Sequence, residues 1–469
     1  MIRTLFLVLV GAVALAVVGL VVGGRGHGPD YSGGSFPTWL KRAGPEARVD
    51  EAVAMEGVAV LPDLMELLDW QPSTSERASR RIYEALPESW QSSFCLLNVS
   101  DPDLVRRQVL RALGGLGSEA SPALASVLAW AGTPDETGQE ALTAALKISP
   151  LAPAVTSQVL TYLLDADPTR KEIAARAMVA ADVPVEGGLP ALLEAVGTSD
   201  PPSVAVVLAL GLYGREAGRA VPRLAPWLRD PNLKQPILLT FRRMGSSAGL
   251  ALTEIRPEIS AQSPVVVEAL DVAARLGPAA APLRPQIQSL EANPAPMIRL
   301  HAALARGQTG QDLPGAVKAL AREVQFQIPD YSLPYFPDHP GLRHIRLSPA
   351  QAAAWLLGEL GRRAEAATPE LASALRSEDP RLVALSAWAL WRINQDAELV
   401  VPALRRSLRY TLDPVTQLIA LEAVAELGSI GGLFDDELEG LQRLGLPLRQ
   451  AAQRTRERLG GGLPELELK

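Results

Sequence analysis

The chain has 469 residues, of which 48% are hydrophobic and 5% aromatic, so it can bury a large core and is neither disordered nor collagen-like. Its formal net charge of −7 gives no global attraction to nucleic acid, and we expect no nucleic-acid partner. A single cysteine, Cys95, excludes an intramolecular disulfide framework and any metal site built from several cysteines.

Residues 4–24 form an uncharged apolar run between Arg3 and Arg25. As a helix this run would reach about 31 Å, close to the roughly 30 Å of a hydrocarbon core, and it is longer than the usual apolar part of a signal peptide. We therefore expect 1–24 to be a single-pass membrane anchor, with a cleaved signal peptide as the alternative. The rest of the protein is expected on the extracytoplasmic side, and the Gly- and Pro-rich residues 25–56 form a flexible tether.

The remainder of the chain repeats two motifs that begin helices. One is Pro-x-Leu-x-x-x-Leu, in which proline suits the first helical turn and apolar residues four apart share a face. It occurs at Pro62, Pro122, Pro222, Pro369 and Pro402, and with a final valine at Pro190. The other is an N-cap acceptor followed by proline. It occurs at Asp101, Asp167, Asp200, Asp230, Ser263, Asn293, Ser348, Asp379 and Asp413.

Successive starts of the second motif lie about 30–34 residues apart wherever no gap intervenes, which indicates an internal repeat. Each unit is predicted to be a helix of about 14 residues, a turn that often holds glycine, and a second helix of about 10 residues. Such turns are expected at 114–117, 211–214 and 360–361. Because neither helix can bury its apolar face alone, the units must stack. Trp227, Trp355, Trp388 and Trp391, at helical spacing, are expected to pack in the stack.

The order Asp-Pro, apolar helix ending in Leu-Gly, then Pro-x-Leu-x-x-x-Leu resembles the HEAT-repeat family, particularly the short bacterial HEAT units of phycobilisome-lyase-like proteins. The resemblance covers nearly all of 57–455, although 137–160 and 232–262 fit only loosely. It implies an all-α fold, a right-handed α-solenoid of about twelve stacked antiparallel helix pairs whose concave surface binds partners. We place the solenoid at 57–324 and 348–460, with a tail at 461–469.

One insertion, 325–347, interrupts the repeat. The segment from Asn293 to Ser348 exceeds one unit by about 24 residues, and long irregular segments are often functional. The insertion holds the residues of a candidate partner-binding loop, Phe326, Tyr331, Tyr335, Phe336, His339 and His344. The alternative is a strap that packs its own aromatic side chains. A metal site at Asp338, His339 and His344 is a third possibility, but the spacing matches no recognised pattern, so we expect no metal and no cofactor.

Sequence motifs for catalysis are not found: there is no phosphate-binding glycine loop, no Gly-x-Ser-x-Gly, no His-Glu-x-x-His and no cysteine pair. Cys95 lies in an apolar run and is expected to be a core residue. Basic pairs at 106–107, 242–243, 362–363 and 405–406 are expected on solvated helix faces, or aligned as an anion-binding stripe.

These patterns favour a non-catalytic, membrane-anchored HEAT-repeat scaffold that binds protein partners. The alternative is a lyase-related enzyme or accessory factor with a ligand pocket near 325–347. A nucleic-acid binder is disfavoured by the charge.

Overall fold

The computed structural model describes residues 36–41, 49, 53, 56–87, 101–310, 312–325, 333–334, 346–409, 413–442 and 446–460. The chain divides into two compact units, Met1–Val185 and Glu186–Lys469. The repeat pattern does not predict this division, because the spacing of helix starts continues across it. The boundaries placed at the insertion and the tail stay predictions.

Unit 1 is built from α2 (Phe36–Leu40), η1 (Gly57–Val60), α4 (Leu61–Leu68), α5 (Thr74–Glu84), α7 (Pro102–Leu116), η3 (Gly117–Ala123), α8 (Leu124–Trp130), α9 (Glu136–Ile148), α10 (Pro153–Leu163) and α11 (Pro168–Ala181). The long helices α7, α9 and α11 pack side by side, and α8 and α10 pack against them. Helix α2 lies within the predicted tether. Its Phe36 and Leu40 are buried, because apolar residues four apart share one helix face.

Unit 2 continues with α12 (Gly188–Thr198), α13 (Val204–Gly211), η4 (Gly214–Ala220), α14 (Val221–Leu224), η5 (Ala225–Arg229), α15 (Pro231–Met244), η6 (Gly245–Ala251), α16 (Leu252–Ile255), η7 (Arg256–Glu258), α17 (Val266–Leu276), η8 (Gly277–Leu283), α18 (Arg284–Ser289), α19 (Pro296–Gln308), α20 (Leu313–Gln325), β1 (Leu333–Pro334), β2 (Arg346–Leu347), α21 (Pro349–Leu360), η9 (Gly361–Ala367), α22 (Thr368–Ala374), α23 (Pro380–Asn394), α24 (Ala397–Arg409), α25 (Pro414–Ala425), η10 (Gly428–Phe434), α26 (Asp435–Gln442) and α27 (Leu446–Gly460). The two short strands pair antiparallel, with Leu333 opposite Leu347.

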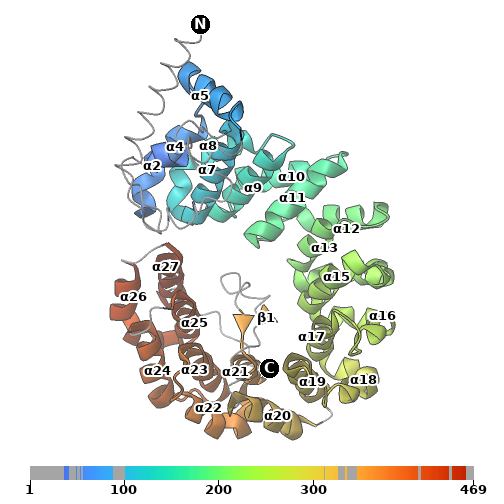
Figure 1. The fold of residues 1–469 in the computed structure, drawn as a ribbon. Helices are drawn as coiled ribbons and strands as arrows, with labels where there is room; N and C mark the ends of the chain where they lie inside the picture. The colour runs from blue at the N-terminus through green and yellow to red at the C-terminus, as the bar shows by residue number, and fades with distance from the viewer. Residues whose placement is uncertain are drawn as a thin grey trace. The chain divides into compact units, whose positions relative to one another are not determined.

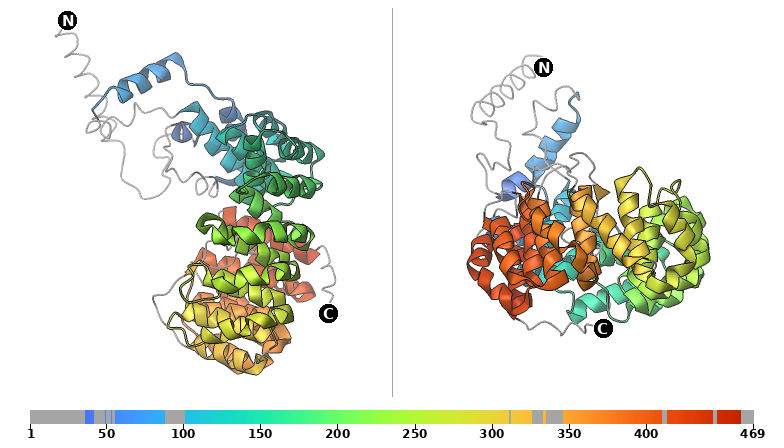
Figure 2. Two further views of the ribbon diagram at one scale, coloured as in Figure 1. Left: turned by 90° about the vertical axis from the view of Figure 1, so that its right-hand side faces the viewer. Right: turned by 90° about the horizontal axis from the view of Figure 1, so that it is seen from below.

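The helices of unit 2 form two layers. The odd-numbered helices from α13 to α27 pack each on the next, and they line the inner side of the arc that unit 2 makes in Figure 1. The even-numbered helices lie on the outer side. The helices follow one another along this arc from α13 in green to α27 in red (Figure 2). The stacking of helix pairs therefore confirms the predicted α-solenoid, while its right-handed twist and its twelve units stay predictions.

Aspartate caps begin several helices of both units, as predicted. In each case the carboxylate accepts a hydrogen bond from the backbone N–H two residues on. These caps are Asp101, Asp167, Asp230, Asp379 and Asp413. Ser348 and Gln351 form the predicted capping box.

Several predicted helix starts are displaced. Helix α13 begins after Ser203 rather than Asp200, because the Ser203 hydroxyl accepts from the N–H groups of the first turn. Helices α17 and α19 begin two residues later than predicted, at Val266 and Pro296. Helix α24 begins at Ala397 and carries Pro402 in its interior, because Asp396 accepts from the N–H of Leu399 and starts the helix earlier.

Glycine stands at or shortly after the end of the first helix in several units, as predicted. Gly117, Gly214 and Gly361 have φ of 58°, 53° and 57°, a conformation that other residues adopt only with strain. Each leads into a 3₁₀ turn and then into the second helix. The turns predicted at 211–214 and 360–361 are therefore confirmed, whereas the turn predicted at 114–117 begins only at Gly117 because α7 continues to Leu116.

The predicted single-pass membrane location is contradicted. No helix in the described parts of the chain is long and apolar enough to cross a bilayer. The longest of these helices, α7, α23 and α27, have 15 residues, whereas a span needs about 20. Residues 4–24, on which the prediction depends, lie outside the described residues.

Candidate binding surface

The predicted partner-binding loop cannot be placed, since all six of its named residues lie outside the described ones. These are Phe326, Tyr331, Tyr335, Phe336, His339 and His344. Asp338, which the sequence analysis grouped with His339 and His344 as a possible metal site, also lies outside the described residues, and so does Cys95. Among the residues that the structure does describe, no group of three or more His, Cys, Asp or Glu side chains could hold a metal ion.

A buried charged cluster joins three inner helices instead. Asp271 of α17 lies 2.6 Å from His301 Nδ1 of α19 and 3.3 Å from Arg242 Nη1 of α15. All three side chains are buried, with exposed fractions of 5%, 0% and 8%. Burial alone would raise the pKa of Asp271, but the facing His301 and Arg242 outweigh it and hold that pKa below its ordinary value.

A cavity of about 50 Å³ adjoins this cluster. Arg275 and Glu359, which pair at 3.1 Å, also line it, so the ion pair links α17 to α21 past the intervening α19. A space of this size has room for only a few water molecules. A carboxylate that orients a histidine is a familiar catalytic arrangement, but His301 is wholly enclosed in the stack and the adjoining space is too small for a substrate. The cluster therefore connects helices.

The sequence gives little signal for this cluster. Arg242 is recognisable as half of a basic pair, whereas Asp271 and His301 were missed because neither belongs to a motif of its own in α17 or α19. Their spacing of about one repeat was the available signal, since residues one unit apart face each other across neighbouring helices.

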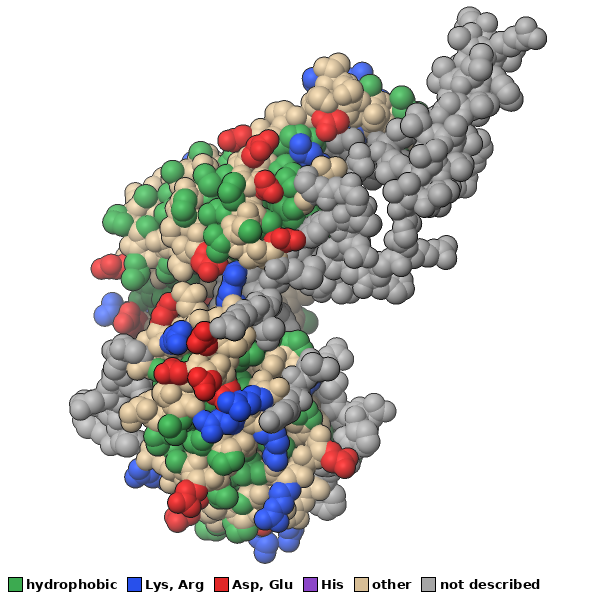
Figure 3. Space-filling model, turned by 90° about the vertical axis from the view of Figure 1, so that its left-hand side faces the viewer, with side chains coloured by type: hydrophobic (Ala, Val, Ile, Leu, Met, Phe, Trp, Pro, Cys, Tyr) green, Lys and Arg blue, Asp and Glu red, His purple; other side chains and the backbone are tan. Residues whose placement is uncertain are grey.

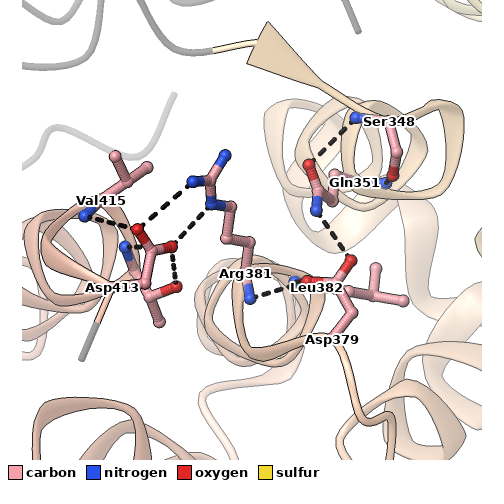
Figure 4. Close-up of polar contacts among 8 residues, drawn as sticks. Ser348, Gln351, Asp379, Arg381, Leu382, Asp413 and Val415 are labelled. Atoms are coloured by element: carbon pink, nitrogen blue, oxygen red, sulfur yellow. Dashed lines mark hydrogen bonds and ion pairs between the residues drawn. The ribbon is translucent and has the colours of Figure 1, made fainter. Parts of the chain in front are cut away.

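Polar side chains also link the starts of α21, α23 and α25 (Figure 4). Gln351 donates from Nε2 to the Asp379 carboxylate at 2.7 Å, and Arg381 donates from Nε to the Asp413 carboxylate at 2.7 Å. Each N-cap aspartate is thus held by the helix before it. Burial tends to raise the pKa of Asp413, but its hydrogen bonds to Arg381 and Thr416 hold that pKa below its ordinary value. This ladder fixes the spacing of successive repeats.

The basic pairs are likewise engaged with neighbouring helices rather than simply solvated. Arg106 is 4% exposed and lies over the ring of Trp130, at 3.7 Å from its centroid. Arg363 donates to the carbonyl of Gly307 at 3.0 Å, and Arg405 to Glu437 at 2.9 Å. Figure 3, viewed from the side on which α24 and α26 lie, shows basic and acidic side chains interspersed on unit 2. At least one arginine of each pair therefore contacts a neighbouring helix. This leaves fewer arginine side chains available to form an anion-binding stripe.

A larger cavity, of about 400 Å³, lies between α19 and α20; we call it the α19–α20 groove. Its floor is apolar, made by Leu300, Ala303 and Ala319. Small side chains facing each other from the two helices leave this space open. The residues at its rim are charged: Glu291, Arg299, Arg306, Lys318, Arg322 and Glu323. A groove of this size, with an apolar floor and a few polar groups, is typical of binding sites.

A second groove, of about 330 Å³, lies between α12 and α14. Leu193 and Val196 of α12 line one side, and Arg219 and Arg223 line the other. Arg223 donates from Nη1 to the carbonyl of Gly197 at 2.7 Å. Its positive charge therefore lies at the C-terminal end of α12, which carries a partial negative charge. Both grooves therefore join apolar surface to arginine side chains in unit 2.

No protein-family model matches the chain, and no curated protein matches it. Among solved structures, the chain is similar to the complex of CpcE and CpcF of phycocyanin lyase from Nostoc sp. PCC7120, at 18% identity over 53% of this chain and 92% of that one, with a TM-score of 0.38. It is also similar to karyopherin Kap121p bound to the SUMO protease Ulp1p, at 13% identity over 87% of this chain and 50% of that one, with a TM-score of 0.32. The similarity to Kap95p has 11% identity over 86% of this chain and 60% of that one, with a TM-score of 0.33. The chain thus spans about half the length of Kap121p. The resemblance to HEAT-repeat proteins that the sequence predicts is confirmed.

Proposed function

We propose that this HEAT-like solenoid is a non-catalytic scaffold that binds protein partners in the grooves of unit 2. The observation that supports the proposal best is the α19–α20 groove, which combines about 400 Å³ of space with an apolar floor and a charged rim. Apolar side chains that enter such a site supply most of the binding energy, while the charged rim selects the partner and its orientation.

The polar contacts of the inner layer suit this role. The Asp271 cluster and the ladder of N-cap aspartates hold successive helices in register. A groove formed between neighbouring helices keeps its width only if those helices keep their spacing. A pre-organised groove loses little conformational entropy on binding, which favours affinity.

Site-specific crosslinking tests this proposal. A photo-crosslinkable residue replaces Ala319, which is half-buried in the groove, or Ser373, which is exposed on α22 in the same outer layer. Crosslinked products formed in cells of the native host are identified by mass spectrometry. We expect a discrete protein at position 319 that is absent at position 373. Identical crosslinked products at positions 319 and 373 would contradict a scaffold that uses these grooves. So would the absence of products both at position 319 and when the photo-crosslinkable residue replaces Leu193 in the second groove.

The alternative function, a lyase-related enzyme or accessory factor with a ligand pocket, has one observation in its favour. Helix α20 lines the groove and ends at Gln325, where the predicted ligand-binding insertion begins. Under this alternative, native mass spectrometry of the purified protein would show a co-purifying small molecule, lost when Ala319→Trp fills the groove. A ligand that persists in that variant would place it elsewhere.

A further inference from the structure

We propose that the α19–α20 groove recognises an acidic, extended segment of the partner, in which two carboxylates flank one apolar side chain. This inference rests on the proposed scaffold function and specifies the chemistry of its partner. It follows from how the charges around the groove are paired and spaced.

The acidic residues of the rim are already neutralised by arginines. Arg299 lies 3.0 Å from Glu323, and Arg306 lies 2.8 Å from Glu291. The rim has four basic and two acidic side chains, and Asp312 beside it lies 3.8 Å from Arg306, so basic groups still outnumber the acidic groups around the groove. The basic groups outside these pairs are Lys318 and Arg322 of α20, both exposed to solvent.

Lys318 and Arg322 stand four residues apart on one face of α20, where like charges repel and weaken a helix. The chain as a whole carries a net charge of −7, so this positive site is opposite in sign to the protein's total charge. An anionic ligand relieves the repulsion and is drawn to this part of the molecule. A basic ligand meets repulsion at the rim.

The spacing of the two basic residues suits an extended peptide. Residues four apart on a helix are separated by about 6 Å along its axis. Side chains two apart on an extended strand point the same way and lie about 6.6 Å apart. Two carboxylates at alternate positions can therefore meet Lys318 and Arg322 together. The residue between them points the opposite way, towards the α19 side of the groove, where Leu300 and Ala303 form part of the apolar floor.

Fluorescence anisotropy with the full-length protein tests this specificity. The probe is a fluorescein-labelled peptide of nine residues with a central Glu-Leu-Glu in a Gly/Ser background. Peptides with Glu-Ser-Glu and Lys-Leu-Lys in its place report on the apolar and the acidic positions. The protein variants are Lys318→Glu with Arg322→Glu, and a control, Arg362→Glu with Arg376→Glu, which makes the same charge change at exposed positions of unit 2 outside the groove. Circular dichroism verifies that both are folded.

We expect the Glu-Leu-Glu peptide to bind and the Lys-Leu-Lys peptide not to bind. Reversing Lys318 and Arg322 should raise the Kd at least about tenfold, while the control changes it less than about twofold. The Glu-Ser-Glu peptide should bind more weakly because it leaves the floor uncovered. Raising the salt concentration should weaken binding, since the rim contacts are exposed.

Any of three results would overturn the inference. If the reversed variant binds the Glu-Leu-Glu peptide as tightly as the original, or if no acidic peptide binds the folded protein, the acidic specificity is wrong. If inorganic polyphosphate competes fully and Glu-Ser-Glu binds as well as Glu-Leu-Glu, the groove detects charge alone. In each case, if a partner protein still crosslinks to the photo-crosslinkable residue at position 319, the proposed scaffold function stands. If no protein crosslinks there, both the scaffold function and the acidic specificity are rejected.

Discussion

Replacing Gly358 with alanine should destabilise unit 2 through one identifiable clash. Gly358 of α21 faces Trp388 of α23, and a Cβ at this position would lie 2.2 Å from the ring atom Cζ3 and 2.6 Å from Cε3. The ring has little room to retreat. Trp355 stacks on it with ring centroids 4.0 Å apart and planes 7° from parallel, and Arg392 lies 4.9 Å from its centroid.

The cost follows from this geometry. Relieving the clash requires a shift of about 1.2 Å, from 2.2 Å to the 3.4 Å at which ordinary contact begins. Overpacking of this kind costs about 1–3 kcal/mol, against a gain of about 0.4–1 kcal/mol when a helical glycine becomes alanine. Gly440 of α26 is the matched control, because nothing lies within 4 Å of a Cβ built there.

Thermal unfolding of the two variants, followed by circular dichroism, gives the comparison. Gly358→Ala should lower Tm by several degrees, about 2–4 °C per kcal/mol in a domain of this size, whereas Gly440→Ala should leave it unchanged or raise it slightly. Near-ultraviolet dichroism should change only in Gly358→Ala, since the tryptophan pair moves. Equal Tm values for the two variants would refute the packing of α21 against α23 described above.

Three further predictions concern the charged contacts. Asp271→Asn should lower the free energy of unfolding by about 3–5 kcal/mol, because it removes the buried carboxylate that contacts both Arg242 and His301; chemical denaturation measures this, and a loss below about 1 kcal/mol would contradict it. The pKa values of Asp271 and Asp413 are lowered by folding, so their contribution to stability is present above the unfolded pKa near 4 and is lost as the pH falls through the folded values. Unfolding at pH 6 and pH 3 should show that loss, and Asp271→Asn should reduce it. Arg381→Met should cost no more than about 1 kcal/mol in denaturation, since the Arg381 and Asp413 side chains are 33% and 28% exposed.

Local signals made most of the fold predictable from the sequence. An aspartate cap satisfies backbone N–H groups within two residues of itself, so Asp101, Asp230 and Asp413 mark helix starts whatever surrounds them. The glycine turns are equally local. Where a second acceptor competes close by, the sequence alone does not decide: Ser203 displaces Asp200, and Asp396 starts α24 before Pro402.

The candidate site was much less predictable, because it depends on contacts between helices. Asp271 and His301 are about one repeat apart and meet only after the helices stack. The groove likewise needs Ala303 and Ala319, two ordinary small residues, to face each other across α19 and α20. Small residues in helices are too common for the sequence to single out such a pair. The aromatic insertion attracted attention by composition, and its predicted role stays a prediction.

The central claim is that the α19–α20 groove binds a protein. Isothermal titration calorimetry tests it most directly. The partner protein captured at position 319 is titrated into wild type, into Ala319→Trp and into the control Ser373→Trp. Because an indole fills the space between the helices, we predict that Ala319→Trp weakens binding at least about tenfold, while Ser373→Trp binds as wild type does. Equal affinity for all three folded proteins would contradict the account.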